Sequence, residues 1–598
     1  MRAALAAGDP SARFLEEQTR AQAVSGENVE KGGRGLEPRA VIAWLDQDTA
    51  LAESAVLDWA AFAKGSLKSN LGEAGWALTG ASIVDTVGDM LSDEARLAAA
   101  EALWSLVARL RVPTQGNPHV VTNNWWAVTH GGALCAALAA ERLAGCECPG
   151  YDADAAPWAL GRLRAFCHHF GPAGLYHEGL GYIRYTCIFL FSAIMAARSQ
   201  GRGDLLEAFP NLRRTLPSLY AATAARAYQD DSVGTPEKFG ASLSWNDMGT
   251  GAGVCAVDHI GLAIAPGEQR ASLKAWFDIL SGPESPNPSL GGHHGCIPMA
   301  WAFHPLGVAR PDTIDLPREV VDSRQGLWFW RSAYRDAQDV VFGLYAKATH
   351  GGGHVHRDAG SLRLEAFGTD WIAGPGQART SRDGQTVAFP AAGEEPRANL
   401  GAVHFQESRV DGILAGIELR KASGCYHERF VSLKANAEGS CPLLLAVTDL
   451  VDDHAERDWV WNWTFPRELN AELDADGAGV KLCRDDGMAV WIRFLEARPK
   501  SLDLCELPES RRTFAAGNTE TYKGKPFLHA VFAPRKHLAV VVAAVWGVKE
   551  TLKAPEGGIH AVSVGEDVRW DRPFGAAVPA GYEPGRSPGP AQCSGAGE

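Results

Sequence analysis

Glycine and ionisable residues crowd together in HGGGHVHRDAGSLRLEAFGTDWIAGPG, residues 350–376. One residue separates His354 from His356, so on an extended chain both imidazoles point to the same side. Such a pair can ligate a metal ion, or place one metal ligand beside one catalytic group. Glycines 351–353 would let the backbone approach a ligand closely. The segment predicts an active-site edge, with a solvated glycine- and histidine-rich loop as the alternative.

A strand pattern follows these histidines. Ser361, Arg363 and Glu365 alternate with apolar residues, which is the period-two pattern of a strand with one wet and one buried face. The sequence therefore predicts a strand whose polar side borders the same edge.

Two asparagines and two tryptophans open a helix pattern within residues 121–139. Indole faces such as those of Trp125 and Trp126 can pack on a sugar ring, and the amides of Asn123 and Asn124 can donate to its oxygens. This composition is typical of a carbohydrate site. In the alternative interpretation, Asn123 caps the helix and the tryptophans belong to the core.

Two candidates are more weakly marked. His130 is one turn beyond Trp126 and could share its face, although a core histidine fits the same spacing. Asp247 lies in the glycine-rich turn at 239–253, which is either the rim of a pocket or an ordinary loop.

A third segment, LYHEGLGYIRYT at residues 175–186, predicts a turn that leads into a helix. Tyr182, Arg184 and Tyr185 follow one another within one turn. A guanidinium beside a tyrosine favours the phenolate, which can act as a base. Alternatively, the tyrosine hydroxyl and Glu178 satisfy buried backbone groups.

The elements that would position these residues change in kind near residue 320. Ser92 can cap a helix, and further helices are expected at the ranges 51–64, 125–144, 155–170, 186–200, 211–229, 253–264 and 268–281. With no strands between them, they predict helix hairpins packed around an axis or in an open array. After about residue 325, short segments rich in β-branched and aromatic residues predict stacked antiparallel sheets.

Composition limits the functional class. A chain of 598 residues with 46% hydrophobic and 21% charged residues is expected to form a soluble protein of two or three domains. No apolar run reaches the ~18 residues of a membrane helix, so no membrane partner is expected. The formal charge of −14 argues against a nucleic-acid partner.

The twelve cysteines are scattered and lack zinc-finger spacing, which predicts buried free thiols in a reducing compartment. The N-terminus has no apolar signal-peptide core. The protein is therefore expected to be cytoplasmic, or periplasmic if a signal peptide has been removed.

The order of the motifs is more specific than any one of them. Asn-Asn at a helix start, E-G-x-G-Y-x-R-Y, N-D-x-G, R-S-A-Y-R-D-A and G-x-H-x-H-x-D-x-G-S follow one another along the chain. In this order the sequence resembles the heparinase II/III-like polysaccharide lyases, relatives of the oligo-alginate lyases, over residues 95–450. The resemblance implies a multidomain α+β protein, with an incomplete (α/α) toroid of helix hairpins at 1–320 and an antiparallel β-sandwich at 321–572. Residues 573–598, which are rich in Pro, Gly and Ala, are expected to be a flexible tail.

The activity implied by the resemblance is β-elimination on a uronic acid in an acidic oligo- or polysaccharide. It implies that Asn124 binds the carboxylate, that Tyr182 is the catalytic tyrosine, and that His354 and Arg379 lie in the active site. Tyr185 and Arg184 would take these places if the register were shifted by one turn.

The sequence departs from the family pattern at two points. Trp125 stands where the family has a histidine that assists proton abstraction, so either His130 replaces that histidine or Tyr182 serves as both base and acid. The structural zinc of the family would use His356 and His404, but Gly374 stands where it has an aspartate. Two protein ligands hold zinc weakly, so we expect no zinc unless Asp358 or Asp383 supplies a third.

Two rival functions are consistent with the same segments. A glycoside hydrolase on the toroid would need two carboxylates across the cleft, for which Glu178 and Asp247 are the candidates. A non-catalytic carbohydrate-binding relative would explain the missing histidine and aspartate. A homodimer is expected only because twofold dimers are common.

Overall fold

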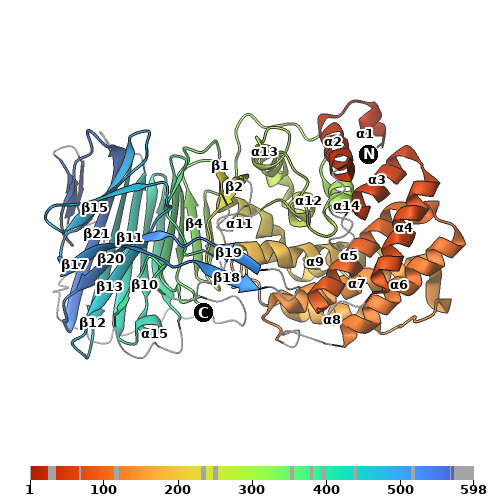
Figure 1. The fold of residues 1–598 in the computed structure, drawn as a ribbon, viewed down its shortest axis with the longest axis horizontal. Coiled ribbons are helices and arrows are strands. Elements are labelled where there is room, and N and C mark those ends of the chain that lie inside the picture. Colours follow the sequence, from red (N-terminus) through yellow and green to blue (C-terminus); the bar gives the residue numbers. More distant parts are fainter. Residues whose placement is uncertain are drawn as a thin grey trace, which may run out of the picture.

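Helices fill the first half of the chain and strands the second, from right to left in Figure 1. The computed structural model describes residues 2–24, 35–65, 69–112, 120–229, 237–246, 253–349, 356–376, 382–391, 399–435, 441–513, 519–559, 561–565 and 568–571. The α-helices are α1 (Arg2–Ala6), α2 (Pro10–Val24), α3 (Leu36–Asp46), α4 (Thr49–Ala63), α5 (Asn70–Val87), α6 (Asp93–Arg111), α7 (Asn124–Ala144), α8 (Ala155–Cys167), α9 (Leu180–Ser199), α10 (Leu205–Ala208), α11 (Thr215–Ala221), α12 (Ala256–Ile264), α13 (Arg270–Leu280), α14 (Cys296–Phe303) and α15 (Arg420–Ser423).

The helical half is a toroid of helix hairpins. Helices α3, α5, α7, α9, α12 and α14 contact one another in this order, and α14 packs back on α3, which makes an inner ring. Helices α4, α6 and α8 pack on its flanks. An ion pair of 2.6 Å between Asp85 and Arg142 joins the C-terminal ends of α5 and α7, and Gln200 donates to the carbonyl of Leu138. The N-terminal ends of α5, α7 and α9 therefore meet at the opposite end of the ring.

Helix α9 is long and apolar enough by composition to cross a membrane, but 72% of its apolar window is buried inside the protein. Its position in the inner ring accounts for this composition. Most described cysteines, such as Cys187 on α9, are buried free thiols as the sequence predicts.

Three larger antiparallel sheets form most of the second half. The five-stranded sheet has the order β3 (Glu319–Asp322), β4 (Leu327–Arg331), β5 (Val341–Tyr345), β6 (Ser361–Ala366) and β7 (Thr369–Ile372). The eight-stranded sheet has the order β14 (Asn470–Leu473), β15 (Gly479–Cys483), β16 (Met488–Phe494), β21 (His537–Val548), β12 (Leu443–Asp452), β11 (Tyr426–Ala435), β10 (Gly412–Glu418) and β9 (Ala402–Arg409). The four-stranded sheet has the order β17 (Ser501–Glu506), β20 (Pro526–Phe532), β13 (Trp459–Thr464) and β8 (Ala388–Pro390).

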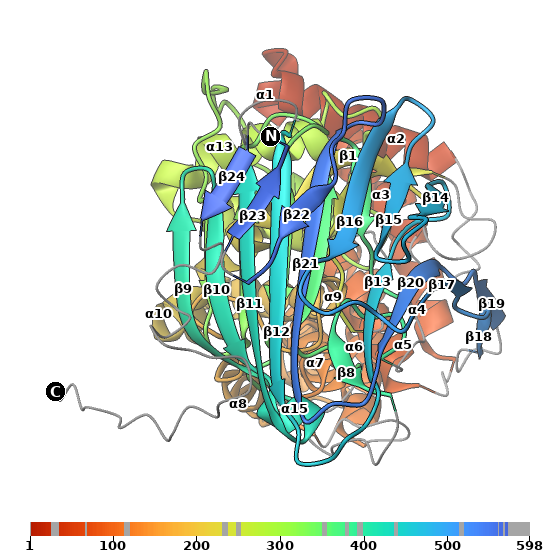
Figure 2. The ribbon, with the colours of Figure 1, turned by 90° about the vertical axis from the view of Figure 1, so that its left-hand side faces the viewer.

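The sandwich core lies between the inner faces of these sheets. Trp461, Leu445 and Phe342 bring β13, β12 and β5 into one buried cluster. Val447 of β12 pairs with Val431 of β11 on one side and with Val542 of β21 on the other. The outer face of the eight-stranded sheet is covered by a small sheet, in front in Figure 2, made of β22 (Pro555–Gly557), β23 (Ala561–Val564) and β24 (Val568–Asp571).

The five-stranded sheet joins the two halves. Phe329 and Tyr345 contact Trp245 on the side of the helices, with ring centroids 5.7 and 6.1 Å apart, while Phe342 faces the sandwich core. Both faces of β6 are therefore buried. The predicted strand is confirmed, but the prediction of a wet face is wrong, because the helical half covers its polar side.

One predicted helix needs a correction. The range 211–229, predicted as one helix, contains α11 and then strand β1 (Thr223–Tyr228), which pairs with β2 (Lys238–Ser242). This hairpin interrupts the helical half, where no strand was predicted.

Between the halves, α14 ends at Phe303 and β3 begins at Glu319. Residues 573–598 lie outside the described residues. The remaining hairpin consists of β18 (Ser510–Thr513) and β19 (Thr519–Tyr522).

Candidate active site at the mouth of the helical ring

The first turns of α7 and α9 form the end of the ring that we call the mouth, defined by Asn124, Tyr182 and Tyr185. Asn123 is the N-cap of α7, and its side chain accepts the backbone N–H of Trp125 at 2.9 Å. This capping bond corrects the prediction that Asn123 binds substrate. Asn124 is only 2% exposed, and its side-chain oxygen has no hydrogen-bond partner among the described residues. That amide is available to a ligand or a water.

Glu178 fixes the start of α7 from the loop before α9. Its carboxylate accepts the backbone N–H of Asn124, with N–O distances of 3.1 and 3.3 Å. It also accepts the hydroxyl of Tyr176 at 2.9 Å, and that hydroxyl lies 2.8 Å from Thr186 Oγ1. Burial, together with the neighbouring carboxylate, raises the pKa of Tyr176 well above its ordinary value. Glu178 is fully buried, so it is not placed to contact substrate as a carboxylate of the cleft, and it satisfies a buried backbone group instead.

The two tyrosines of α9 share a face. Tyr182 and Tyr185 are three residues apart on the first turns of the helix, and both are half-buried. Arg184 lies on another face, where its guanidinium donates to Asp258 of α12 at 2.7 Å inside the core. The predicted contact of Arg184 with substrate is therefore wrong, and this guanidinium does not stabilise a Tyr182 phenolate.

His130 belongs to the core of the ring. Its ring packs against Trp126 and Trp158, with centroids 4.7 and 4.9 Å away, and its Nδ1 lies 2.6 Å from the carbonyl of Trp126. Burial lowers the pKa of His130 to about 4. The imidazole is therefore neutral at pH 7 and 5% exposed, so its predicted catalytic role is wrong.

Trp125 and Trp126, at the start of α7, differ in how far they are buried. Trp126 is buried and donates from Nε1 to the carbonyl of Arg162 at 2.8 Å, which corrects its predicted sugar contact. Trp125 is half-buried, so the prediction that it contacts substrate still stands.

The mouth adjoins the strand half through the carbonyl of His177, the residue before Glu178. Asn246 donates to this carbonyl from Nδ2 at 3.0 Å, and Tyr345 of β5 donates from its hydroxyl at 3.3 Å. The backbone N–H of Asn246 donates in turn to Asp358 at 2.9 Å. The segment that begins α9 therefore contacts residues just before β6.

The described end of the glycine- and histidine-rich segment lies in this seam. The backbone N–H of His356 donates to Asn246 Oδ1 at 3.2 Å, and Lys347 forms a 3.0 Å ion pair with Asp358. Burial raises the pKa of Asp358, but the Lys347 ammonium and His356 hold it below its ordinary value. The described residues His356 and Asp358 are thus linked through Asn246 to the segment that precedes α9. Three predicted site residues lie outside the described residues: Asp247, His354 and Arg379.

The predicted zinc ligands do not assemble a metal site. Within the described ranges, no three His, Cys, Asp or Glu side chains are grouped so that they could hold a metal ion. His356 is buried in the seam. His404 lies on β9, where its Nε2 is 4.0 Å from Glu428 and its ring stacks on Phe405.

A guanidinium occupies the place where the resemblance implies an aspartate. A Cβ atom on Gly374 would lie 3.1 Å from both Nε and Nη2 of Arg363. Arg363 is buried and donates to the carbonyl of Ser244 at 2.6 Å and to Gln385 at 2.8 Å. Asp358 is paired with Lys347, and Asp383 is exposed. A fixed cation beside Gly374 would repel a metal ion, so these residues do not fit the zinc site.

The sequence analysis missed one part of the mouth. The pair His293–His294, within GGHHGC before α14, reaches the ring between α5 and α9. The ring centroids of His293 and Tyr185 are 6.2 Å apart, and those of His294 and Phe189 are 6.5 Å apart. Adjacent histidines flanked by glycines were a visible signal, but their spacing matches no metal or catalytic motif.

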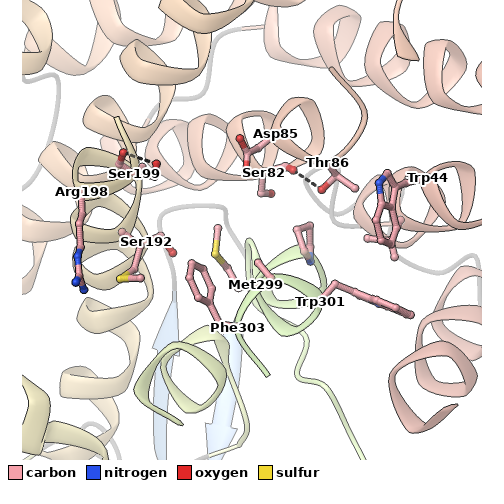
Figure 3. A pocket seen from close by; sticks show the side chains of 15 residues that line it. Trp44, Ser82, Asp85, Thr86, Ser192, Arg198, Ser199, Met299, Trp301 and Phe303 are labelled. Carbon is pink, nitrogen blue, oxygen red and sulfur yellow. Dashed lines mark hydrogen bonds between the residues drawn. The ribbon is translucent and has the colours of Figure 1, made fainter. Parts of the chain in front are cut away.

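A hollow lies at the other end of the ring, where α3, α5, α9 and α14 run toward their C-terminal ends. It encloses 590 Å³, and its walls include Trp44, Met299, Trp301 and Phe303 (Figure 3). The Thr86 hydroxyl beside it donates to a carbonyl of its own helix at 2.8 Å. The charged side chains at its edge are engaged in ion pairs elsewhere, Asp85 with Arg142 and Arg198 with Asp204. It contains none of the predicted site residues.

Comparison with known proteins supports the resemblance at the level of the fold. No family model and no curated protein sequence matches the chain. Among solved structures, a mutant heparan sulfate lyase from Pedobacter heparinus is similar with a TM-score of 0.57 and 14% identity, over 91% of this chain and 82% of that chain. A heparinase III is similar with a TM-score of 0.55 and 11% identity, over 90% and 82%. The chain thus has the heparinase-type fold of an incomplete (α/α) toroid followed by an antiparallel β-sandwich.

Proposed function

We propose that this protein is a lyase that cleaves an acidic, uronic-acid-containing oligo- or polysaccharide by β-elimination. The observation that carries the proposal is the position of Asn124 and Tyr182 on the first turns of α7 and α9, two helices that pack on each other in a heparinase-type toroid. The Asn124 amide, whose oxygen has no hydrogen-bond partner among the described residues, and the half-buried phenol of Tyr182 lie there on two helix starts, beside the seam that contains His356.

The chemistry assigns a task to each group. The proton on C5 of a uronate is poorly acidic, so hydrogen-bond donors must neutralise the carboxylate as charge develops on it. The amide of Asn124 supplies such a donor. The C5–H bond then breaks, a C4–C5 double bond forms, and the bond from C4 to the glycosidic oxygen breaks as that oxygen gains a proton.

Tyr182 is the group that protonates the leaving oxygen. A tyrosine hydroxyl can donate its proton to an oxygen within hydrogen-bond reach. The Arg184 guanidinium, which would favour the phenolate, is directed at Asp258 instead. Positioned acid catalysis of this kind contributes about 10²–10⁴-fold to a rate.

The buried position of Glu178 favours a lyase over a hydrolase. A glycoside hydrolase needs two carboxylates that flank the scissile bond. Glu178 is fully buried and accepts the N–H of Asn124, so it does not reach a glycosidic oxygen. The net charge of −14 favours uronic polymers with few sulfates over densely sulfated ones.

The test is the ultraviolet absorbance of the C4–C5 unsaturated uronate, followed with oligosaccharides of alginate, glucuronan, heparan, chondroitin, hyaluronan and ulvan. We expect absorbance to rise with at least one of them. Reducing ends without absorbance would replace the proposal with the hydrolase. Binding without cleavage would replace it with the non-catalytic relative.

Tyr182→Phe tests the acid. It should lower kcat by about 10²–10⁴-fold with little change in KM, because only the transferred proton is removed. Tyr426→Phe on β11, also half-buried, is the matched control and should keep the wild-type rate. A Tyr182→Phe enzyme of near-normal rate would remove Tyr182 from the mechanism.

A further inference from the structure

The loop before α14 carries an exposed histidine into the ring. It comprises Gly291–Gly295, and His293 within it is exposed while His294 is half-buried. Gly295 adopts the left-handed conformation at φ 74° and begins α14. The loop thus presents two imidazoles whose surroundings differ.

A buried network fixes this loop from the helix side. Glu37 of α3 is 1% exposed, and its Oε1 accepts the Thr79 hydroxyl at 2.9 Å and the Gly295 N–H at 2.7 Å. Thr79 Oγ1 lies 2.9 Å from His294 Nδ1. A hydroxyl has one proton, and since Thr79 donates it to Glu37, Nδ1 of His294 must be the donor to Thr79.

The fit around His294 is close. A Cβ atom on Gly75 of α5 would lie 2.4 Å from its Nε2, so only glycine lets the imidazole pack there. A buried carboxylate is costly unless it is hydrogen-bonded, and Glu37 receives two such bonds from this network. The backbone that carries His293 is therefore held rigidly, which suits a residue that must be positioned accurately.

The neighbour of His293 places it at the mouth. Its ring meets Tyr185 at a centroid distance of 6.2 Å and an interplanar angle of 62°. Tyr185 lies on the same face of α9 as Tyr182. The ring contact with Tyr185 thus puts His293 near the face of α9 that carries the proposed acid.

We propose that His293 is the general base of the reaction, a role that rests on the proposed function. Its neutral imidazole accepts the C5 proton as the C4–C5 double bond forms, and Tyr182 gives its proton to the leaving oxygen. The imidazolium then returns a proton to the Tyr182 phenolate through water, which restores both groups. An imidazole suits this work because one ring nitrogen can take up a proton and release it again within the catalytic cycle.

The proposal explains how the site can work although Trp125 stands where the family resemblance implies a histidine. The family resemblance implies an imidazole at the position of Trp125, and His130 is buried in the core, where its pKa is lowered to about 4. His293 reaches the same face of the mouth from the other side of the ring.

The test uses the full-length His293→Ala and His293→Gln variants on the oligosaccharide that the wild type cleaves. We expect kcat to fall about 10²–10⁴-fold. Added imidazole should restore part of the rate of His293→Ala, and the loss of kcat/KM that the wild type shows at acidic pH should disappear. His454→Ala is the matched control, since His454 is 76% exposed on the strand half.

Each outcome separates the two proposals. If the wild type forms unsaturated product and His293→Ala keeps its rate, His293 is not the base and the lyase proposal stands. If activity falls without rescue by imidazole while the melting temperature falls too, the role of His293 is structural. If the wild type forms no unsaturated product with any oligosaccharide, the lyase proposal and the role of His293 fall together.

Discussion

At the scale of single residues, Glu178 shows how a buried carboxylate prepares a binding group. It accepts the N–H of Asn124 and the hydroxyl of Tyr176, so it sets the position of the amide without touching substrate. Glu178→Ala would leave the buried N–H of Asn124 unpaired, at about 1–3 kcal/mol, whereas the Tyr176 hydroxyl keeps its contact with Thr186. We expect a lower melting temperature and a lower kcat.

The conservative variant Glu178→Gln distinguishes a positioning role of Glu178 from a role as catalytic acid. In Glu178→Gln the amide oxygen can still accept one of the two bonds, so most of the activity should return. If Glu178 were instead the acid of a hydrolase, Gln would be as inactive as Ala. Product formation by the two variants, with the thermal unfolding of each, decides between these roles.

His130 makes stability depend on pH. Its pKa is about 4 in the folded protein and near 6.5 when unfolded, so the unfolded chain binds more protons between these values. Its contribution to stability is complete above pH 6.5 and is lost as the pH falls toward 4. The loss is about 2 kcal/mol at pH 5.

His130→Asn tests this linkage. Asparagine keeps a donor for the Trp126 carbonyl but does not titrate, so the variant should be less stable overall yet lose less stability between pH 7.5 and pH 5. The measurement is the melting temperature of both proteins across this range. If the melting temperatures of the two proteins changed equally with pH over this range, His130 would not be the source of the pH-dependent stability.

Spacing along one helix could have identified part of this site. Tyr182 and Tyr185 are three residues apart and share a face, whereas Arg184 is two residues from Tyr182 and must lie elsewhere. Partners from other elements could not be predicted in this way. Trp158 of α8 buries His130, and Tyr185 meets His293 from a loop far along the chain.

At the scale of elements, α7 depends on close contact with both neighbours. A Cβ atom on Gly131 would lie 2.8 Å from the carbonyl oxygen of Phe189 on α9, and one on Gly132 would lie 2.7 Å from that of Ala74 on α5. The approach of three inner helices therefore requires the two glycines. Because α7 and α9 carry Asn124 and Tyr182, this packing also sets the width of the mouth.

Gly131→Ala should lower the free energy of unfolding by about 1–3 kcal/mol, because an added methyl in a packed contact forces the backbone apart. Gly161→Ala in α8 is the matched control. Gly161 is exposed, nothing lies within 4 Å of its Cβ position, and alanine should stabilise the helix by about 0.8–1 kcal/mol. Denaturant unfolding of both variants measures the difference, and equal effects would rule out the close packing of α7.

Elements defined by local pattern were predictable, and those defined by distant pairing were not. The helix expected at 51–64 is α4, and Ser92 accepts the N–H of Ala95 as the N-cap of α6. The range 211–229 has a helical composition, yet Thr223–Tyr228 pairs with β2 and becomes a strand. Its partner lies beyond the window in which helical periodicity is judged.

At the scale of the whole molecule, a buried ion pair joins the helical half to the five-stranded sheet. Arg226 of β1 donates from Nη2 to Glu365 of β6 at 2.6 Å, and both side chains are largely shielded from solvent. The sequence pattern predicted that Glu365 lies on a solvent-exposed face of its strand. The alternation of polar and apolar residues within one strand cannot indicate that the helical half of the protein covers that face. The same junction includes the seam between His177 and Asp358.

Arg226→Met would leave Glu365 as an uncompensated buried charge beside Asp370, whose pKa is raised by burial and then by Glu365. Removing one partner of a buried pair costs about 3–5 kcal/mol. We expect the calorimetric transition to move to lower temperature or to split, because the junction weakens before either core. Activity should fall too, since the mouth abuts the junction.

Two comparisons decide whether this effect comes from the buried pair. The double variant Arg226→Met with Glu365→Leu should recover most of the stability, because apolar side chains of similar size often replace a buried ion pair without loss. Arg420→Met removes the exposed pair with Glu418, at 3.2 Å, and should cost less than about 1 kcal/mol. If Arg226→Met cost no more than Arg420→Met, the two halves would be held together by apolar packing around Trp245 and Phe329 rather than by charge.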